Sequence, residues 1–171
     1  MCSENLRSTN SSFLPLLEID IAMPQLQREW ASCDLIANYL AEFVTDGSGD
    51  TLRRTNMLSA ALNELLESVF KYADGEGHLI CRIAKNERRH RVEMIFNARH
   101  GLRQRLETAI HADENRAIDD YLSGLQTSTA PGPAEALLGL AVNFLAEVSL
   151  MPEEGNLIGL VVDLPFDGAS H

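Results

Sequence analysis

Three polar side chains of different chemistry are spaced so that they share one edge of a helix. Glu64, Ser68 and Lys71 follow one another at steps of four and three residues, which places them in one line on a helical surface. A carboxylate and an ammonium are groups that proton transfer uses, but the solvated edge of an ordinary amphipathic helix carries the same groups. The spacing alone leaves both interpretations open.

The helix that must position this line is predicted over residues 51–74. Its apolar residues also recur at steps of three and four, and they form a neighbouring stripe: Leu58, Leu62, Leu65, Leu66, Val69 and Tyr72. Such a stripe packs on a core. Loop residues at 46–50 and a glycine-containing stop at 74–77 bound the helix. The polar line therefore lies beside a buried face.

The remaining elements are predicted from alternation, periodicity and turn residues. They are a strand over 13–23, a helix over 25–44, hairpin strands over 78–84 and 91–96 with a turn at 86–88, helices over 101–111 and 114–126, a loop over 127–133, a buried helix over 134–150 and a strand over 156–164. In the first helix we expect these residues to face inward: Leu26, Trp30, Leu35, Ile36, Tyr39, Leu40 and Phe43.

This order of elements predicts an α+β fold. We expect a two-layer α/β sandwich, in which a mixed, mainly antiparallel sheet is covered on one face by helices. Residues 1–12 are rich in Ser and Asn and are expected to form a flexible tail, and residues 13–171 are expected to form a single domain.

Composition narrows the class of function. The chain has 171 residues and a formal net charge of −11, which disfavours nucleic acid and anionic membrane as partners. Three cysteines without CxxC spacing and five histidines without paired spacing give no disulfide framework and no metal site. No signal peptide or membrane span is evident. We therefore expect a reduced, cytoplasmic protein.

The element order, together with the sequence from Glu64-Leu65-Leu66 to Lys71-Tyr72, resembles the Bergerat ATP-binding fold of the GHKL superfamily of histidine-kinase-like ATPases. The similarity is greatest to its small bacterial regulators, the anti-sigma-factor kinases and the SiaB-type kinases of partner-switching systems. In that family the helix carries Glu-x-x-x-Asn. The resemblance gives Glu64 the role of catalytic base, while Ser68 stands where the magnesium-binding Asn belongs. Magnesium demands near-ideal octahedral ligands, and a shorter Ser side chain supplies a poor one.

The second family motif, Asp-x-Gly-x-Gly, matches residues 97–101. Asn97 replaces the Asp that accepts a hydrogen bond from adenine, and its amide oxygen could still accept one. Arg99 replaces the first Gly and brings a side chain into space that the base needs, whereas Gly101 is kept.

The third family motif, Gly-x-Gly-x-Gly, aligns with residues 132–136. Gly132 is kept, but Pro133 removes one backbone N–H from the set that cradles phosphate. Glu135 adds a carboxylate next to the expected triphosphate. With all three motifs altered, we expect a pseudokinase with a remnant nucleotide site at Ser68, Lys71, Asn97, Gly101 and Gly132, and no cofactor.

The resemblance implies a bacterial regulator that acts by binding a protein, such as a STAS-domain protein, a response regulator or a sigma factor. A homodimer through the N-terminal strand and first helix is expected from the same relatives.

The predicted partner-binding residues are the arginines of the hairpin tip, Arg88, Arg89 and Arg91. Two alternatives stay open: an active serine/threonine protein kinase that uses ATP, Mg²⁺ and Glu64, and a small-molecule sensor that uses the remnant pocket.

Overall fold

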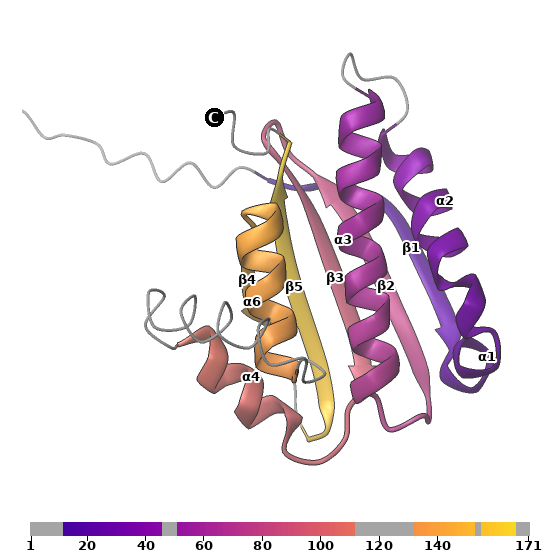
Figure 1. Cartoon of the computed structure of the whole chain (residues 1–171), viewed down its shortest axis with the longest axis vertical. Helices are drawn as coiled ribbons and strands as arrows, with labels where there is room; N and C mark the ends of the chain where they lie inside the picture. Colours follow the sequence, from indigo (N-terminus) through magenta and orange to yellow (C-terminus); the bar gives the residue numbers. More distant parts are fainter. Residues whose placement is uncertain (1–11, 46–50, 112–131, 153–154, 167–171) are drawn as a thin grey trace, which may run out of the picture.

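A computed structural model describes residues 12–45, 51–111, 132–152 and 155–166. In chain order the elements are β1 (Leu14–Ala22), α1 (Met23–Arg28), a 3-10 turn (Trp30–Ser32), α2 (Cys33–Thr45), α3 (Thr51–Tyr72), β2 (His78–Lys85), β3 (Arg89–Asn97), α4 (Leu102–Ile110), α6 (Pro133–Phe144), β4 (Glu147–Leu150) and β5 (Leu157–Pro165) (Figure 1). The predicted helix over 114–126 and most of the predicted tail lie outside the described residues.

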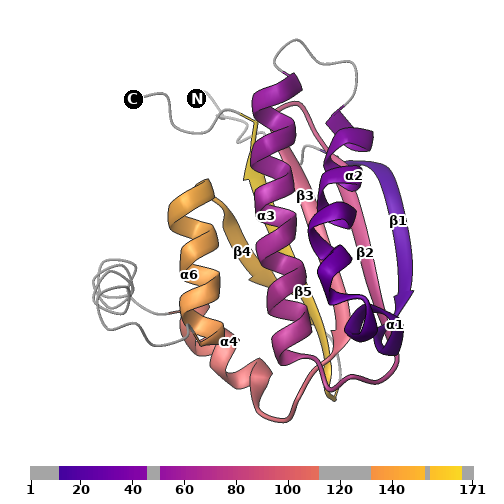
Figure 2. The same ribbon diagram turned by 45° about the vertical axis from the view of Figure 1, so that its right-hand side comes forward.

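The strands form one antiparallel sheet in the order β1-β2-β3-β5-β4. Every pairing in the described part of this sheet is antiparallel, so the α+β prediction is confirmed and the expected mixed character of the sheet is not found. Helices α2, α3 and α6 lie side by side on one face of the sheet (Figure 2). The described residues form a two-layer sandwich, and none of their helices covers the other face of the sheet.

The core lies between α3 and the covered face of the sheet. Five of the six residues in the predicted α3 stripe are fully buried, and Tyr72 is half-buried. The sheet contributes alternate residues of its central strands, which is the pattern of a half-buried antiparallel sheet: Leu79, Cys81 and Ile83 from β2, Val92, Met94 and Phe96 from β3, and Ile158, Leu160, Val162 and Leu164 from β5.

The predicted helix over 25–44 is interrupted, and this corrects the sequence interpretation. Helix α1 ends at Arg28, and Glu29 leaves the helical conformation with φ −110° and ψ 34°. Trp30 begins a short 3-10 turn and packs on Phe70 of α3, with ring centroids 4.3 Å apart. The interruption shifts the helical phase of α2.

As a result, three residues expected to face inward point to solvent. Leu35 is 64% exposed, Tyr39 66% and Phe43 56%. The buried side of α2 is made instead by small and medium residues, which allow close approach to α3 and the sheet: Cys33, Ala37, Leu40, Ala41, Val44 and Thr45.

The predicted helix over 134–150 is also wrong beyond Phe144. Leu145 takes a left-handed conformation with φ 51°, which ends α6. The next residues form β4 and pair with β5 from Glu147↔Asp163 to Leu150↔Leu160. Val148 and Leu150 alternate with Glu147 and Ser149 along β4, so period-two burial replaces the helix expected from an apolar run.

The hairpin between β2 and β3 turns where the sequence predicts it. The side-chain oxygen of Asn86 accepts the backbone N–H groups of Arg88, at 2.9 Å, and Arg89, at 2.8 Å. The N–H of Asn86 donates to the carbonyl of Arg89 at 3.0 Å. An Asn side chain that mimics a backbone turn in this way fixes a tight hairpin tip.

Candidate functional site

The polar line of α3 is present, but two of its three members bond to their own helix. Ser68 Oγ donates to the carbonyl of Glu64 at 2.9 Å. The ammonium of Lys71 lies 3.7 Å from Oε2 of Glu67, a half-exposed pair at i,i+4. Such exposed pairs contribute little to stability. The hydroxyl and ammonium therefore have local partners, whereas the Glu64 carboxylate forms no hydrogen bond or ion pair with the described residues.

Glu64 is the half-buried carboxylate of this edge. Burial raises the pKa of Glu64 above its ordinary value, and the nearby charge of Glu67 raises it further. A raised pKa is what a carboxyl general base needs, but structural carboxylates in partly buried sites show the same shift. The geometry is compatible with a base at Glu64 and does not require one.

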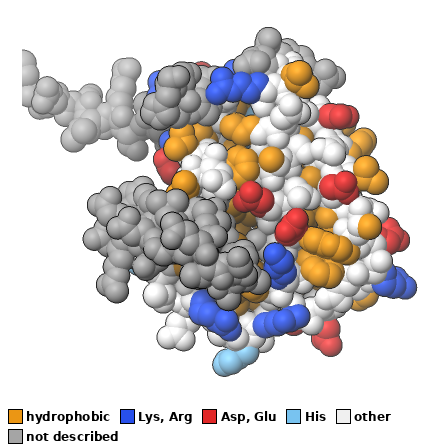
Figure 3. Space-filling model, viewed as in Figure 1, with side chains coloured by type: hydrophobic (Ala, Val, Ile, Leu, Met, Phe, Trp, Pro, Cys, Tyr) orange, Lys and Arg blue, Asp and Glu red, His pale blue; other side chains and the backbone are white. Residues whose placement is uncertain are grey.

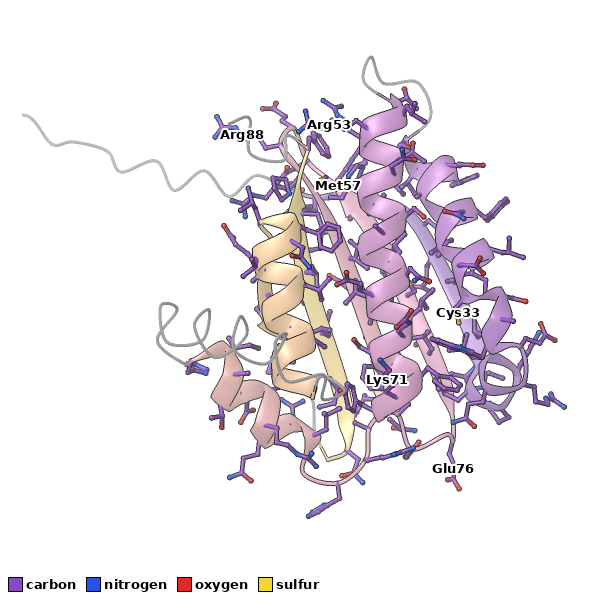
Figure 4. All side chains as sticks on the ribbon, in the orientation of Figure 1. Cys33, Arg53, Met57, Lys71, Glu76 and Arg88 are labelled. Carbon is purple, nitrogen blue, oxygen red and sulfur yellow. The ribbon has the colours of Figure 1, made fainter. Side chains whose placement is uncertain are left out.

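The end of α3 meets the end of β3, so two predicted motifs come together. Ala73 forms an isolated bridge with Ala98, and the N–H of Arg99 donates to the carbonyl of Tyr72 at 3.1 Å. The N–H of Asp74 donates to the carbonyl of Asn97 at 3.0 Å. Lys71 lies at this end of α3 (Figure 4). Glu64 lies seven residues earlier, about 10 Å along the helix axis.

The Arg99 side chain folds back on α3. Its Nε donates to the carbonyl of Ala73 at 3.2 Å, where a cation complements the negative end of a helix. The sequence comparison with the ATPase motif placed this side chain in the expected base site. In the structure the bond to Ala73 fixes it at the helix end.

Asn97 and Gly101 have different local roles. A Cβ placed on Gly77, which has φ +73°, would lie 2.7 Å from Nδ2 of Asn97, so the Asn97 amide lies close over the Gly77 backbone. Gly101 has φ +80° and precedes α4 as its N-cap. Its left-handed conformation favours glycine, which matches the glycine kept from the second motif.

Gly132 precedes α6 without the conformation that a glycine-rich phosphate loop uses. Its φ is −76° and ψ is −179°, an extended conformation open to any residue, and its carbonyl accepts the N–H of Ala136 at 3.0 Å. Helix α6 runs beside α3 on the covered sheet face (Figure 1). The third motif thus lies at the start of a helix, as predicted. Gly132 itself is not in the left-handed conformation that such a loop uses.

The predicted partner-binding arginines fall into two groups. Arg91 forms two 2.7 Å bonds with the carboxylate of Asp163, and its guanidinium lies 4.0 Å from the ring centre of Phe13. Arg89 lies 2.5 Å from Glu147. These carboxylates raise the pKa of both arginines. Arg88 is exposed and forms no ion pair with the described residues.

Within the same described residues, no group of three His, Cys, Asp or Glu side chains is placed to hold a metal ion. No described helix is both long enough and apolar enough to cross a bilayer.

One surface feature was missed by sequence reasoning. Leu35, Tyr39 and Phe43 form an exposed apolar stripe on α2, which we call the α2 stripe, and Tyr39 and Phe43 stack at 6.4 Å. A groove of about 410 Å³ lies beside it, lined by Tyr39, Glu42, Phe43, Thr51 and Thr55. The i,i+4,i+8 spacing could have identified the stripe, since Ala37, Leu40, Ala41 and Val44 already supply a complete buried face.

The described architecture defines an α+β class, an open antiparallel sheet with helices on one face. No protein-family model and no curated protein matches the sequence. Among solved structures, the fold is similar to a chain in the crystal structure of the SiaB–SiaC complex from Pseudomonas aeruginosa, with a TM-score of 0.58 and 16% sequence identity. The match covers 88% of this chain and 90% of that chain. The two chains share a fold.

Proposed function

We propose that this chain is a degenerate histidine-kinase-like ATPase-fold regulator that acts by binding a protein partner in a bacterial partner-switching pathway. The observation that carries the proposal is the fold likeness to a chain of the SiaB–SiaC complex over 88% of this chain. SiaB is in complex with SiaC in that crystal structure. We assign this chain a regulatory protein as its partner, and the family resemblance suggests a STAS-like protein, a response regulator or a sigma factor.

The substitutions in the nucleotide motifs support binding over catalysis. Ser68 stands in place of a magnesium ligand, and its hydroxyl donates to its own helix. Lys71 pairs with Glu67, and Gly132 is extended and followed by Pro133. Ser68 therefore lacks the amide oxygen of the magnesium ligand, and Pro133 lacks a backbone N–H that would face phosphate, whereas Lys71 and Gly132 are kept. A preformed surface that sequesters its partner and releases it on a signal needs none of these groups.

We test partner binding by affinity capture from the native cell. Wild-type protein is expected to retain one regulatory protein, identified by mass spectrometry, that reversal of Arg88, Arg89 and Arg91 to Glu releases. The single reversal Arg88→Glu is the cleaner variant, because Arg89 and Arg91 hold Glu147 and Asp163. Capture of no regulatory protein by wild type would contradict the proposed function. Capture unaffected by the reversals would instead place the interface elsewhere.

We also propose a homodimer through β1 and α2. Strand β1 is an edge strand of the sheet, and α2 presents the α2 stripe on the same side of the molecule (Figure 2). Antiparallel pairing of two β1 edges around a two-fold axis would continue the sheet and bring the two stripes together.

The homodimer predicts a mass of twice 18.9 kDa by light scattering. Tyr39→Glu should return the monomer, because it places a charge at the centre of the stripe. Leu145→Glu is the matched control: Leu145 is 50% exposed and follows α6, away from α2. A wild-type monomer at high micromolar concentration, or equal effects of both variants, would rule out this interface.

A further inference from the structure

A guanidinium and a histidine contact one aromatic ring just after β5 ends. The Phe166 ring packs edge-on against His90, with centroids 4.6 Å apart, and the Arg54 guanidinium lies 4.9 Å from its centre. The N–H of Phe166 donates to the carbonyl of Arg88 at 2.9 Å. Lys85 is the cross-strand partner of His90. We call Arg54, Lys85 and Arg88 the basic end.

The basic end has no carboxylate partner among the described residues. Three arginines on the neighbouring uncovered face of the sheet differ in this respect, because Arg82 pairs with Glu18, Arg89 with Glu147 and Arg91 with Asp163. The buried Nε–H of Arg54 donates to no acceptor among the described residues. A buried guanidinium N–H without an acceptor is costly. Arg54, like Lys85 and Arg88, therefore keeps a positive charge that the described residues do not neutralise.

The local field at the basic end is positive. His90 is buried, and burial first, then the charges of Lys85 and Arg54, lower the pKa of His90 to about 4. These two cations are therefore close enough to act on one ring. Helix α3 also begins here, with no acidic residue in its first turn, so the positive end of its dipole adds to the field.

The shape of the basic end favours a macromolecular anion over a small ion. Arg88 projects from the tip of the β2–β3 hairpin, and Arg53 lies near the start of α3 at the same end of the molecule (Figure 4). The space-filling view shows a Lys and Arg patch at its upper end and further Lys and Arg patches in its lower half (Figure 3). The charges are spread over a hairpin tip and a helix end, and this spacing matches an extended segment with several carboxylates.

We propose that the basic end binds an acidic segment of a partner protein. The proposal rests on the function proposed above, that the chain acts by binding a protein, and it adds the chemistry that the partner must present. Electrostatic contacts of this kind act mainly on the rate of association and on specificity, so the acidic segment selects and orients the partner.

The test is a binding titration with a fluorescent twelve-residue peptide in which Glu alternates with Ser, against the same peptide with Gln in place of Glu. Wild-type protein should bind only the Glu peptide, and affinity should fall several-fold between 50 and 200 mM salt, as expected for exposed charges. The double variant Lys85→Gln/Arg88→Gln should bind at least tenfold more weakly. The double variant Arg28→Gln/Arg105→Gln removes the same charge elsewhere and should bind as wild type does.

The proposal is wrong if the protein shows no preference for the Glu peptide, or if the two double variants lose the same affinity. It is also wrong if binding appears only after Asp46, Asp50 and Asp167 are changed to Asn, because the chain's own carboxylates would then occupy the basic end. A natural partner that remains bound to Lys85→Gln/Arg88→Gln with unchanged affinity would also refute it. That last result would leave the proposed function itself intact, so the two failures are distinguishable.

Discussion

Leu62→Ala is expected to lower the free energy of unfolding by about 2–5 kcal/mol. Leu62 is fully buried on the α3 stripe. Shortening Leu62 leaves a cavity where α3 packs on the sheet. The neighbouring helix α2 and the β-strands are closely packed and can collapse into this cavity only in part. The loss should appear in urea unfolding followed by circular dichroism, as a lower midpoint with an unchanged slope.

Leu52→Ala provides the control on the same helix. Leu52 is 75% exposed, so its truncation should change stability by no more than about 0.5 kcal/mol. If Leu62→Ala and Leu52→Ala unfold at the same urea concentration, the burial of Leu62 between α3 and the sheet is contradicted.

The second large effect is a loss of stability in mild acid that depends on His90. Burial and nearby cations lower the pKa of His90 to about 4, while the unfolded chain should titrate near about 6.5. Because the folded pKa is lowered, the stabilisation is complete above the unfolded pKa and is lost as the pH falls through the folded pKa. Between pH 7 and pH 4.5 this one group should remove about 2.5 kcal/mol.

His90→Gln isolates this contribution. The variant keeps a polar side chain of similar size that does not titrate, so its loss of stability between pH 7 and pH 4.5 should be about 2.5 kcal/mol smaller than that of wild type. His78→Gln is the matched control, since His78 is exposed and pairs with Asp20 at 2.5 Å. Identical acid profiles for wild type and His90→Gln would show that His90 is not buried in its neutral form.

Periodic segments were predictable from the sequence, and interruptions were not. The α3 stripe and the alternation in β2, β3 and β5 repeat over many residues, so local pattern and burial agree. The break after Arg28 is followed by Trp30, whose ring packs against Phe70, forty residues away, and a local pattern does not contain such a distant contact. Strand β4 has only four residues inside an apolar run, and periodicity cannot separate such a strand from a buried helix.

In the candidate site, too, the features set by local sequence order were predictable, and those set by contacts between distant residues were not. The meeting of the end of α3 with the end of β3, where the N–H of Asp74 donates to Asn97, was predictable in outline from the order of motifs along the chain. The sequence could not show that Arg89 and Arg91 are paired, because Glu147 and Asp163 lie on other strands and meet them only across the sheet. The α2 stripe was missed for a related reason: the helical phase changes at a break that tertiary packing decides.

The kinase alternative makes a distinct demand on the same site. An active enzyme requires magnesium-dependent ATP binding beside Glu64, with an open path to the hydroxyl of a partner. The proposed regulator requires only the scaffold. Titration of Mg-ATP with thermal unfolding separates the two most directly, since a ligand at about 100 times its dissociation constant adds about 2.7 kcal/mol of stability. We predict no change in melting temperature up to millimolar Mg-ATP; a saturable, magnesium-dependent increase that Glu64→Gln or Asn97→Ala alters would contradict the account.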